Sequence, residues 1–403
     1  MKVLFLSHRF PYPPTFGSKV RAFNVIRHLA REHEVTVLSL ARSDAEADEA
    51  QGIAPFCAAH RAVRVHNVVQ AAKIVATLPS TITASEAFFH SAELQREVDR
   101  QLANGGFDFI FAHCSAVGRY IEHVEGIPKL MDFCDVDSRK WLDYLAFKPW
   151  PLALGYRWEA WRMAAAERRV AAHVDVVTVA TQGEVATLAQ AGVTERVDWF
   201  PNGVDIDYFA PSAQAYDPDV ISFVGRMDYF PNVQCMVEFC ADVWPKLRSA
   251  RPTLKLQIVG AAPTAAVLAL ARVDGVSVTG SVPDVRPYVQ GSALTIAPLK
   301  IARGTQNKIL EAMAMEVPVV SSRIAADGVD AVPGEHLLVA DDRDETCETI
   351  LRLLGDPAER GRLAKAGRAR VLSHHAWPNA MSRLDGIMDR CMRPAPLPLA
   401  QPA

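Results

Sequence analysis

Short apolar runs alternate with longer amphipathic segments in the first half of the chain. The runs at 3–7, 35–40, 107–112 and 174–180 have the length and the β-branched content of strands, and residues 19–31 follow a helical period. Strands that alternate with crossover helices form a parallel sheet covered on both faces. The pattern therefore predicts a Rossmann-like α/β domain.

The same alternation restarts after the loop 200–205, which is rich in turn-forming residues. Further apolar runs follow at 220–224, 254–259, 276–279, 294–297 and 317–321. We therefore predict two Rossmann-like domains, 1–200 and 216–376, with a ligand cleft between the carboxyl ends of their sheets. The helical pattern over 377–392 is expected to cross back and complete the first domain. The Pro-rich tail 393–403 is expected to be disordered.

Composition narrows the class of protein. The chain has 403 residues, 50% of them hydrophobic, and a formal net charge of -3, which argues against nucleic acid as a partner bound through a broad basic surface. Its seven cysteines form no C-x-x-C pair, as expected in a reducing cytosol. No run approaches the ~18 apolar residues of a membrane span. We expect a cytoplasmic protein, with peripheral contact at the inner face of the cytoplasmic membrane left open.

The loop after the first strand is the first candidate for chemistry. It leads to Gly17 and Ser18 at the start of a helix, where exposed N–H groups and the positive end of the dipole suit a phosphate or a sugar. An equally supported alternative is that Gly17 only allows the turn and Ser18 caps the helix. Neither a G-x-G-x-x-G fingerprint nor a P-loop occurs in the chain, which makes a dinucleotide cofactor less expected.

The second half carries a cation after its first strand and a helix after its fourth. Arg226 follows the run 220–224, where a bound diphosphate needs a positive charge. A helix expected to begin near Thr305 or Gln306 has Lys308 in its first turn and Glu311 one turn later. The cations and the helix N-terminus suit a leaving diphosphate, and the Glu311 carboxylate suits ribose hydroxyls. Without further pattern, a solvated Lys308–Glu311 pair on an ordinary helix is the favoured alternative.

Three longer strings carry a family resemblance. The segments GTQNKILEAMAMEVPVV (304–320), PNGVD (201–205) and FVGRMDYFPN (223–232) resemble the retaining GT-B glycosyltransferases of family 4. They look most like the bacterial sugar transferases of PEP-CTERM/exosortase exopolysaccharide systems. The resemblance implies the GT-B fold and hexosyltransferase-type transfer from a nucleoside-diphosphate sugar to a glycan or lipid-linked acceptor. It also implies that no metal or other cofactor is needed.

The resemblance also implies roles for individual residues. Arg226 matches the diphosphate cation, Glu311 matches the carboxylate that holds the ribose, and His113 matches a histidine near the donor sugar. The residues expected at the catalytic centre are Arg226, Lys308 and His113. Those expected to bind substrate are Gly17, Ser18, Arg303, Gly304, Thr305, Gln306, Asn307 and Glu311.

The chain departs from the family pattern at three places. Family members carry two Glu residues separated by seven others, and Arg303 occupies the first of these positions, so recognition of the donor sugar must differ. Residues 231–232 are Pro-Asn where relatives have a Lys. The candidate cation that replaces this lysine is Lys308, or less favourably Lys300 or Arg303. Glu316 replaces a Gly at the end of the helix, where a positive φ is often needed and costs a non-glycine residue about 1 kcal/mol.

Several alternatives stay open on the sequence alone. Asp135 and Asp137 form a D-x-D that could bind a divalent metal, although helix capping explains them more simply. Segment 139–161 holds four of the seven Trp residues, for which packing is slightly favoured over a bilayer interface. A sugar-nucleotide epimerase or phosphorylase, or a non-catalytic nucleotide-sugar-binding scaffold, remains a functional alternative.

Overall fold

Both predicted parallel sheets are present, one in each of two units. The computed structural model describes residues 1–15, 17–194, 196–213 and 215–393. The first unit comprises Met1–Phe200 and the chain from Met381 onward, and the second comprises Pro201–Ala380. Residues 394–403 of the tail expected to be disordered lie outside the described residues.

Seven strands form the sheet of the first unit. They are β1 (Lys2–Ser7), β2 (Glu34–Ala41), β3 (Ala59–Arg64), β4 (Phe109–His113), β5 (Lys129–Cys134), β6 (Val176–Val179) and β7 (Val197–Trp199). All pairs are parallel in the order β3-β2-β1-β4-β5-β6-β7. Ser7 at the carboxyl end of β1 lies opposite Ser39 on one side and His113 on the other. The strand order reverses between β1 and β4, which is where open α/β sheets bind ligands.

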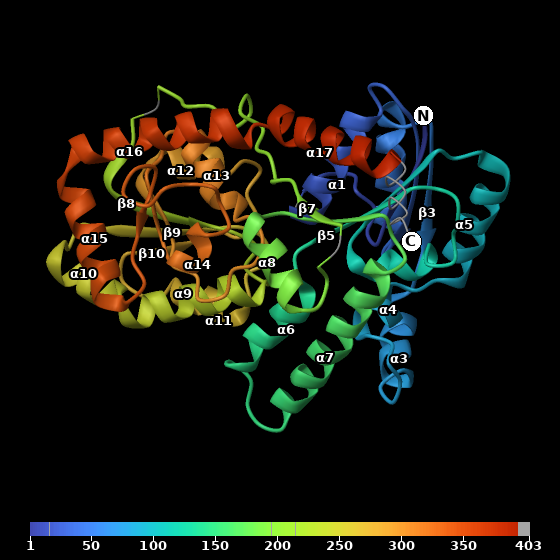
Figure 1. Cartoon of the computed structure of the whole chain (residues 1–403). Helices are drawn as coiled ribbons and strands as arrows, with labels where there is room; N and C mark the ends of the chain where they lie inside the picture. The colour runs from blue at the N-terminus through green and yellow to red at the C-terminus, as the bar shows by residue number, and fades with distance from the viewer. Residues whose placement is uncertain (16, 195, 214, 394–403) are drawn as a thin grey trace, which may run out of the picture. The chain divides into compact units, whose positions relative to one another are not determined.

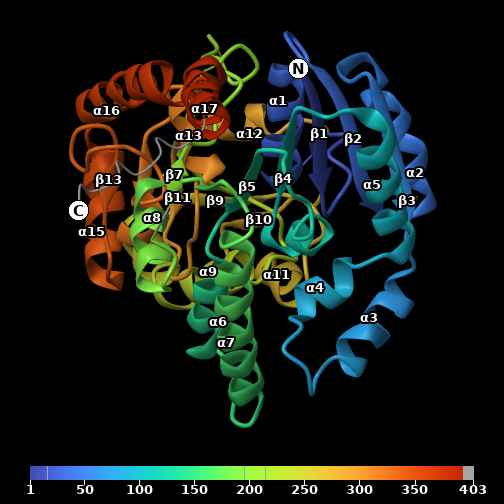
Figure 2. The same cartoon turned by 45° about the vertical axis from the view of Figure 1, so that its right-hand side comes forward.

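Helices cover this sheet, and β4 is buried along its whole length. The helices are α1 (Gly17–Leu29), α2 (Asp44–Glu49), α3 (Asn67–Ala76), α4 (Ala84–Phe89), α5 (Ala92–Gly105), α6 (Asp137–Leu145), α7 (Leu152–Ala171) and α8 (Gln182–Gln190), with 3-10 turns η1 (Ala50–Phe56) and η2 (Ser115–Tyr120). Local signals define their ends: the Ser91 hydroxyl caps α5, and Gly106 ends it at φ 58°. Figures 1 and 2 show α3, α4, α6 and α7 extending together below the sheet of this unit.

Six parallel strands form the second sheet. They are β8 (Asp217–Val224), β9 (Lys255–Val259), β10 (Val276–Val278), β11 (Ser292–Ala297), β12 (Val319–Ser321) and β13 (Leu338–Val339). Their order is β10-β9-β8-β11-β12-β13, so the reversal falls between β8 and β11. The loops after these two strands contain Arg226 and residues 298–306, so the sheet brings both predicted anion-binding segments to one edge.

Helices also cover both faces of the second sheet. They are α9 (Phe230–Asp242), α10 (Trp244–Ala250), α11 (Ala265–Leu270), α12 (Arg286–Gln290), α13 (Asn307–Ala314), α14 (Arg323–Ala326), α15 (Arg343–Gly355) and α16 (Pro357–Arg370). A π-turn η3 (Val371–His375) and α17 (Trp377–Met392) follow, and α17 belongs to the first unit from Met381 onward. In Figure 1, α9, α10 and α11 lie on one face, and α12, α13 and α16 lie on the other. The described residues include no helix with the length and apolar character that crossing a bilayer demands.

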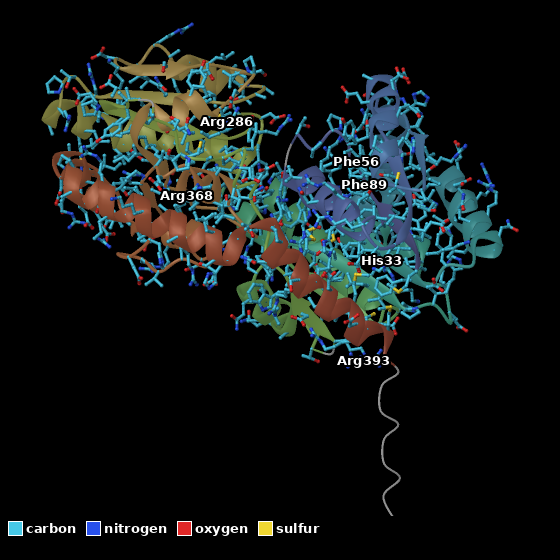
Figure 3. All side chains as sticks on the ribbon, turned by 90° about the horizontal axis from the view of Figure 1, so that it is seen from above. His33, Phe56, Phe89, Arg286, Arg368 and Arg393 are labelled. Carbon is cyan, nitrogen blue, oxygen red and sulfur yellow. The ribbon has the colours of Figure 1, made fainter. Side chains whose placement is uncertain are left out.

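Glu316, just after α13, has the left-handed conformation that the sequence predicts. Its φ is 57°, which costs a non-glycine residue about 1 kcal/mol. Arg368 on α16 (Figure 3) donates a hydrogen bond to the Ala314 carbonyl and lies 3.9 Å from the Glu316 carboxylate. The strain prediction at this position is therefore confirmed in its geometry.

Candidate functional site

Arg226 lies at the carboxyl end of β8, where the strand order reverses. Its side chain is exposed, and its guanidinium donates two hydrogen bonds to the Asp228 carboxylate at 3.0 and 2.6 Å. The preceding Gly225 donates its N–H to the Val259 carbonyl at 3.0 Å, which continues the pairing of β8 with β9. Asp228 thus orients a guanidinium that solvent still reaches, as binding of an anion requires.

Lys308 of α13 reaches the loop that follows β8. Its ammonium donates to the Asn232 side-chain oxygen at 2.7 Å, and the Asn232 amide donates to the Arg226 carbonyl at 2.9 Å. The charge of Lys308 therefore lies beside Asn232, where the resemblance leads us to expect a lysine. Lys300, a weaker candidate for this role, forms an ion pair with Glu238 at 2.5 Å instead. This geometry supports Lys308 as the substitute cation.

Burial shifts the protonation equilibria of the two charged groups on α13. It lowers the pKa of Lys308 to about 8 and raises the pKa of Glu311 to about 7. The ammonium lies 4.2 Å from the centre of the Phe223 ring and bonds to Asn232 rather than to Glu311. Among the described residues, the Glu311 carboxylate has no hydrogen bond or ion pair. The alternative of a solvated Lys308–Glu311 pair is therefore wrong.

Two glycines make room for the Asn232–Lys308 bond. A Cβ on Gly225 would lie 2.6 Å from the Asn232 amide nitrogen and 3.3 Å from the Lys308 ammonium. Gly260 has φ 148°, and a Cβ there would lie 1.8 Å from the Gly225 carbonyl oxygen. The ends of β8 and β9 therefore tolerate no side chain at these two positions. Sequence reasoning had assigned neither glycine a role.

The loop before α13 is held by its backbone. Gly304 has φ 59°, and a Cβ on Gly328 would lie 2.2 Å from the Gly304 carbonyl oxygen. The Gln306 amide donates to the Arg303 carbonyl at 3.1 Å. The turn is therefore tightly packed, and glycine at 304 is required by its left-handed conformation.

The start of α13 offers donors that the helix itself does not use. Gln306 is the N-cap residue and provides no side-chain cap, so the N–H groups of Asn307 and Lys308 lack intrahelical acceptors. The Thr305 hydroxyl oxygen is buried, with no hydrogen-bond partner among the described residues. A helix N-terminus with an unused hydroxyl beside it suits the oxygens of a phosphate. The predicted residues 303–308 and 311 thus come together near the switch point of the second sheet.

In the first unit, His113 belongs to a buried polar network at the end of β4. Its Nδ1 lies 3.0 Å from the Asp132 carboxylate. Asp132 also accepts two hydrogen bonds from the Arg21 guanidinium, at 2.8 and 3.0 Å, and one from the Thr178 hydroxyl at 3.0 Å. Arg21 donates further to the Phe200 carbonyl at 3.1 Å. Elements α1, β4, β5 and β6 therefore meet at one carboxylate.

This network sets the state of the imidazole. Burial alone would raise the pKa of Asp132, but the Arg21 guanidinium and His113 hold it well below its usual range. An ionised carboxylate only accepts hydrogen bonds, so the proton of His113 is on Nδ1 when the ring is neutral. The Nε2 atom is then the nitrogen with an acceptor lone pair. His113 is therefore oriented and fixed in one tautomer.

The same cluster contains three side chains of metal-binding type. The ligand atoms of His113, Asp132 and Cys134 lie within 4.8 Å of one another. However, burial raises the pKa of the Cys134 thiol well above its usual value, and Arg21 already neutralises Asp132. A divalent ion would place its charge beside a buried guanidinium, so these donors do not suit one.

Gly17 is the first residue of α1 and Ser18 is the second. A Cβ on Gly17 would meet nothing within 4 Å, so packing does not require glycine there. Ser18 lies inside the helix and does not cap it, which corrects the capping alternative. The open space at Gly17 leaves room for the predicted approach of a substrate.

The D-x-D segment does not cap α6 as expected. The N-cap is Val136, which lies between the two aspartates and has no side-chain cap; its N–H donates to the Glu184 carboxylate at 2.8 Å. Asp137 is the first helical residue and accepts a hydrogen bond from Ser115 at 3.2 Å. Capping is thus wrong, whereas compensation of the helix dipole by Asp137 fits. Burial raises the pKa of Asp135.

Arg21, Thr178 and Asp132 were not among the predicted site residues. They come from separate elements: the register of the sheet places Asp132 opposite Thr178 and His113, and Arg21 reaches Asp132 from α1. The one signal in the sequence is an Asp in the middle of the apolar run 129–134. A carboxylate in a buried strand needs partners, so this position could have been flagged.

Comparisons with known families cover both units. Residues 16–203 match the family described as glycosyl transferase 4-like domain, and residues 218–356 match glycosyl transferases group 1. The chain therefore carries two glycosyltransferase domains. A curated relative supports this: the GDP-mannose-dependent monoacylated alpha-(1-6)-phosphatidylinositol monomannoside mannosyltransferase of Corynebacterium glutamicum is 25% identical over 242 residues. That match spans 55% of this chain and 64% of the relative, which is less than two thirds of its length.

Solved structures show the same fold. Sucrose-phosphate synthase from Thermosynechococcus elongatus aligns with a TM-score of 0.74 at 18% identity, over 97% of this chain and 99% of that one. HepE from Anabaena, solved in complex with UDP, aligns with a TM-score of 0.68 at 14% identity, over 97% and 100%. The expected GT-B fold is confirmed.

Proposed function

We propose that this glycosyltransferase moves a sugar from a nucleoside-diphosphate sugar to a glycan or lipid-linked acceptor, with retention of anomeric configuration and without a metal ion. We further propose that it acts in the cytoplasm, at the inner face of the membrane, in bacterial exopolysaccharide or other surface glycan synthesis. The PEP-CTERM/exosortase setting rests on the sequence resemblance alone.

One observation carries the proposal: the second unit gathers a guanidinium, an ammonium and unused N–H groups at one sheet edge. As the glycosidic bond to the donor breaks, negative charge builds on the diphosphate oxygens. Arg226, Lys308 and the N-terminus of α13 would stabilise that charge from fixed positions. Glu311 would accept hydrogen bonds from the ribose hydroxyls. Protein cations would then neutralise the leaving diphosphate, as a divalent ion does in metal-dependent enzymes.

The remaining chemistry concerns the sugar. We propose that the acceptor attacks from the face that the leaving group vacates, while the departing phosphate takes the acceptor proton. Paired carboxylates at glycosidase geometry are then not required. His113, held by Asp132 through Nδ1, would present its other nitrogen to a donor-sugar hydroxyl. Arg303, in the place of the usual Glu, would contact the sugar with opposite charge.

The experiment is a panel of UDP-, GDP- and ADP-sugars, each incubated with and without lipid-linked acceptors, once in EDTA and once with Mg²⁺ or Mn²⁺ added in excess. Free nucleoside diphosphate and glycosylated product are measured, and NMR of the product gives the anomeric configuration. The proposal expects turnover in EDTA that depends on an acceptor. Turnover only after Mg²⁺ or Mn²⁺ is added, or an inverted product, would contradict it.

The substitution at 303 favours one alternative. Loss of the usual Glu could leave a nucleotide-sugar-binding scaffold without turnover. Stoichiometric binding with no transfer to any acceptor would support the scaffold. Conversion of the donor sugar without an acceptor would support an epimerase instead.

A further inference from the structure

The tip of the α6–α7 hairpin exposes large apolar side chains. Trp150 is 80% exposed, and Trp158 and Trp161 are about half exposed, with their rings stacked at 5.0 Å. Leu152 and Leu154 on the first turns of α7 are also exposed. The slightly favoured interpretation that the Trp residues of this segment pack inside the domain is therefore wrong for three of the four. Exposed large apolar side chains that gather in one region mark an interaction site.

A second element of the first unit, α3, also exposes apolar side chains. Helix α3 exposes Val68, Val69 and Val75, with Val68 at 83%, and Leu78 follows just after its end. Its inward-facing Gln70 is buried and donates to the carbonyls of residues 88 and 90. The helix therefore has a fixed orientation and directs valines into solvent.

A buried ion pair on α7 fixes these two elements to each other. Arg162 pairs with Glu159, and both are buried. The Arg162 guanidinium donates to the carbonyls of Thr77 and Ser80 at 3.3 and 3.4 Å, and the Glu159 carboxylate accepts from the N–H of Ala84 at 2.6 Å. The chain after α3 is thereby attached to the middle of α7. Figures 1 and 2 show both elements on the same side of the first sheet.

We call the exposed apolar side chains of these two joined elements the apolar face. Its members are Val68, Val69, Val75, Leu78, Trp150, Leu152, Leu154, Trp158 and Trp161. Segments 66–85 and 144–158, which contribute most of it, hold no Asp or Glu, whereas Lys73, Lys148 and Arg157 supply positive charge. The chain as a whole has a net charge of -3, so this acid-free region departs from the average surface.

We propose that the apolar face docks on an anionic phospholipid bilayer. Tryptophan, with an apolar ring and a polar N–H, is the residue most suited to the headgroup boundary, and adjacent Lys and Arg attract anionic lipids. A second copy of the chain suits the face less well, because contact between two such faces would bring like charges together. The bilayer is also where a lipid-linked acceptor resides. The inference takes this acceptor from the proposed function but does not depend on sugar transfer.

The test is flotation of the full chain with vesicles of phosphatidylcholine alone and of phosphatidylcholine mixed with phosphatidylglycerol. The wild-type protein is expected to float with the anionic vesicles and to be released in part by high salt. Trp150→Ala/Leu154→Ala is expected to lower the vesicle partition coefficient about tenfold or more. The control Leu268→Ala/Val332→Ala removes two exposed apolar side chains of the second unit and should float like the wild type.

Thermal unfolding of both variants establishes that they fold. Neither flotation nor unfolding requires transferase activity, so failure here is distinct from failure of the proposed function. A wild-type protein that stays unbound with both vesicle types would overturn the inference. So would equal flotation of the Trp150 variant and the control, or a dimer that the Trp150 variant alone abolishes.

Discussion

Each unit contains one carboxylate whose surroundings differ sharply from those of the other. In the first unit, the buried Asp132 carboxylate accepts hydrogen bonds from Arg21 and Thr178 and lies 3.0 Å from His113. In the second unit, the partly buried Glu311 carboxylate has no such partner among the described residues. The pKa of Asp132 lies well below its usual range, and that of Glu311 is raised to about 7. The protein compensates the charge of Asp132 but provides no hydrogen bond or ion pair for Glu311 among the described residues. This difference separates a structural network that orients His113 from the site that we propose for the substrate.

The largest expected effect comes from breaking the compensated network. Asp132→Asn leaves the buried Arg21 guanidinium without its counter-charge, which should lower the free energy of unfolding by about 3–5 kcal/mol. Urea unfolding, monitored in each variant on the unit that carries the substitution, measures this. Asp228→Asn is the control, because its pair with Arg226 is about half exposed and should change stability by less than about 1 kcal/mol. Equal effects of the two substitutions would show that the comparison is wrong.

Arg226→Ala should have the next largest effect, on activity rather than on folding. Loss of one donor to the leaving group should lower kcat about 100-fold, with little change in the unfolding midpoint because the side chain is exposed. Arg286→Ala is a close control: Arg286 (Figure 3) pairs with Asp284 two residues before it, in the same unit. Similar losses of transfer in both variants would remove the special role of Arg226.

Glu311→Gln should act in opposite directions on stability and on binding. The folded pKa of Glu311 is raised to about 7, so the ionised group costs stability as pH rises from its unfolded pKa through the folded one. Above that range, the free energy of unfolding of the Gln variant should exceed that of the wild type by about 1–2 kcal/mol. This figure is reduced because the side chain is partly exposed. Its affinity for nucleotide should fall. If the Gln variant is less stable than the wild type at pH 8, the protein stabilises the charge of Glu311 as it does that of Asp132, and the comparison fails.

The smallest expected effect concerns backbone strain outside both networks. Glu316→Gly removes a non-glycine residue at φ 57°, and should stabilise the protein by about 1 kcal/mol, or roughly 2–4 °C in Tm. The Arg368 contact at 3.9 Å is partly exposed and contributes little. Calorimetry of the variant measures the shift. A lower Tm would mean that the Arg368 contact outweighs the strain.

Much of the architecture follows from the sequence. The apolar runs correspond to strands of both sheets, α13 begins within two residues of the predicted start, and the positive φ of Glu316 was expected from a missing glycine. These features depend on local pattern and local backbone chemistry. Such features can be predicted because each is decided within a few residues.

The contacts that set the chemistry could not be predicted in the same way. His113 and Asp132 meet through strand register, Arg21 reaches Asp132 from α1 across 111 residues, and Lys308 meets Asn232 across 76 residues. The pKa shifts depend on burial, which the sequence does not specify. The exposure of the Trp-rich segment could not be predicted either, because an amphipathic pattern has the same form whether its apolar side faces protein or lipid.

The central claim is that protein cations, Lys308 among them, neutralise a bound diphosphate in the second unit. The most direct measurement is calorimetric titration with UDP, GDP and ADP in EDTA, near the pKa of about 8 of Lys308, in buffers of different ionisation enthalpy. Because about half of the ammonium is deprotonated there, binding should take up about half a proton per nucleotide, and affinity should decline as pH rises further. Lys308→Met should abolish the uptake, while Lys300→Met should retain it. Tight binding with no proton uptake, unchanged in Lys308→Met, would contradict the claim.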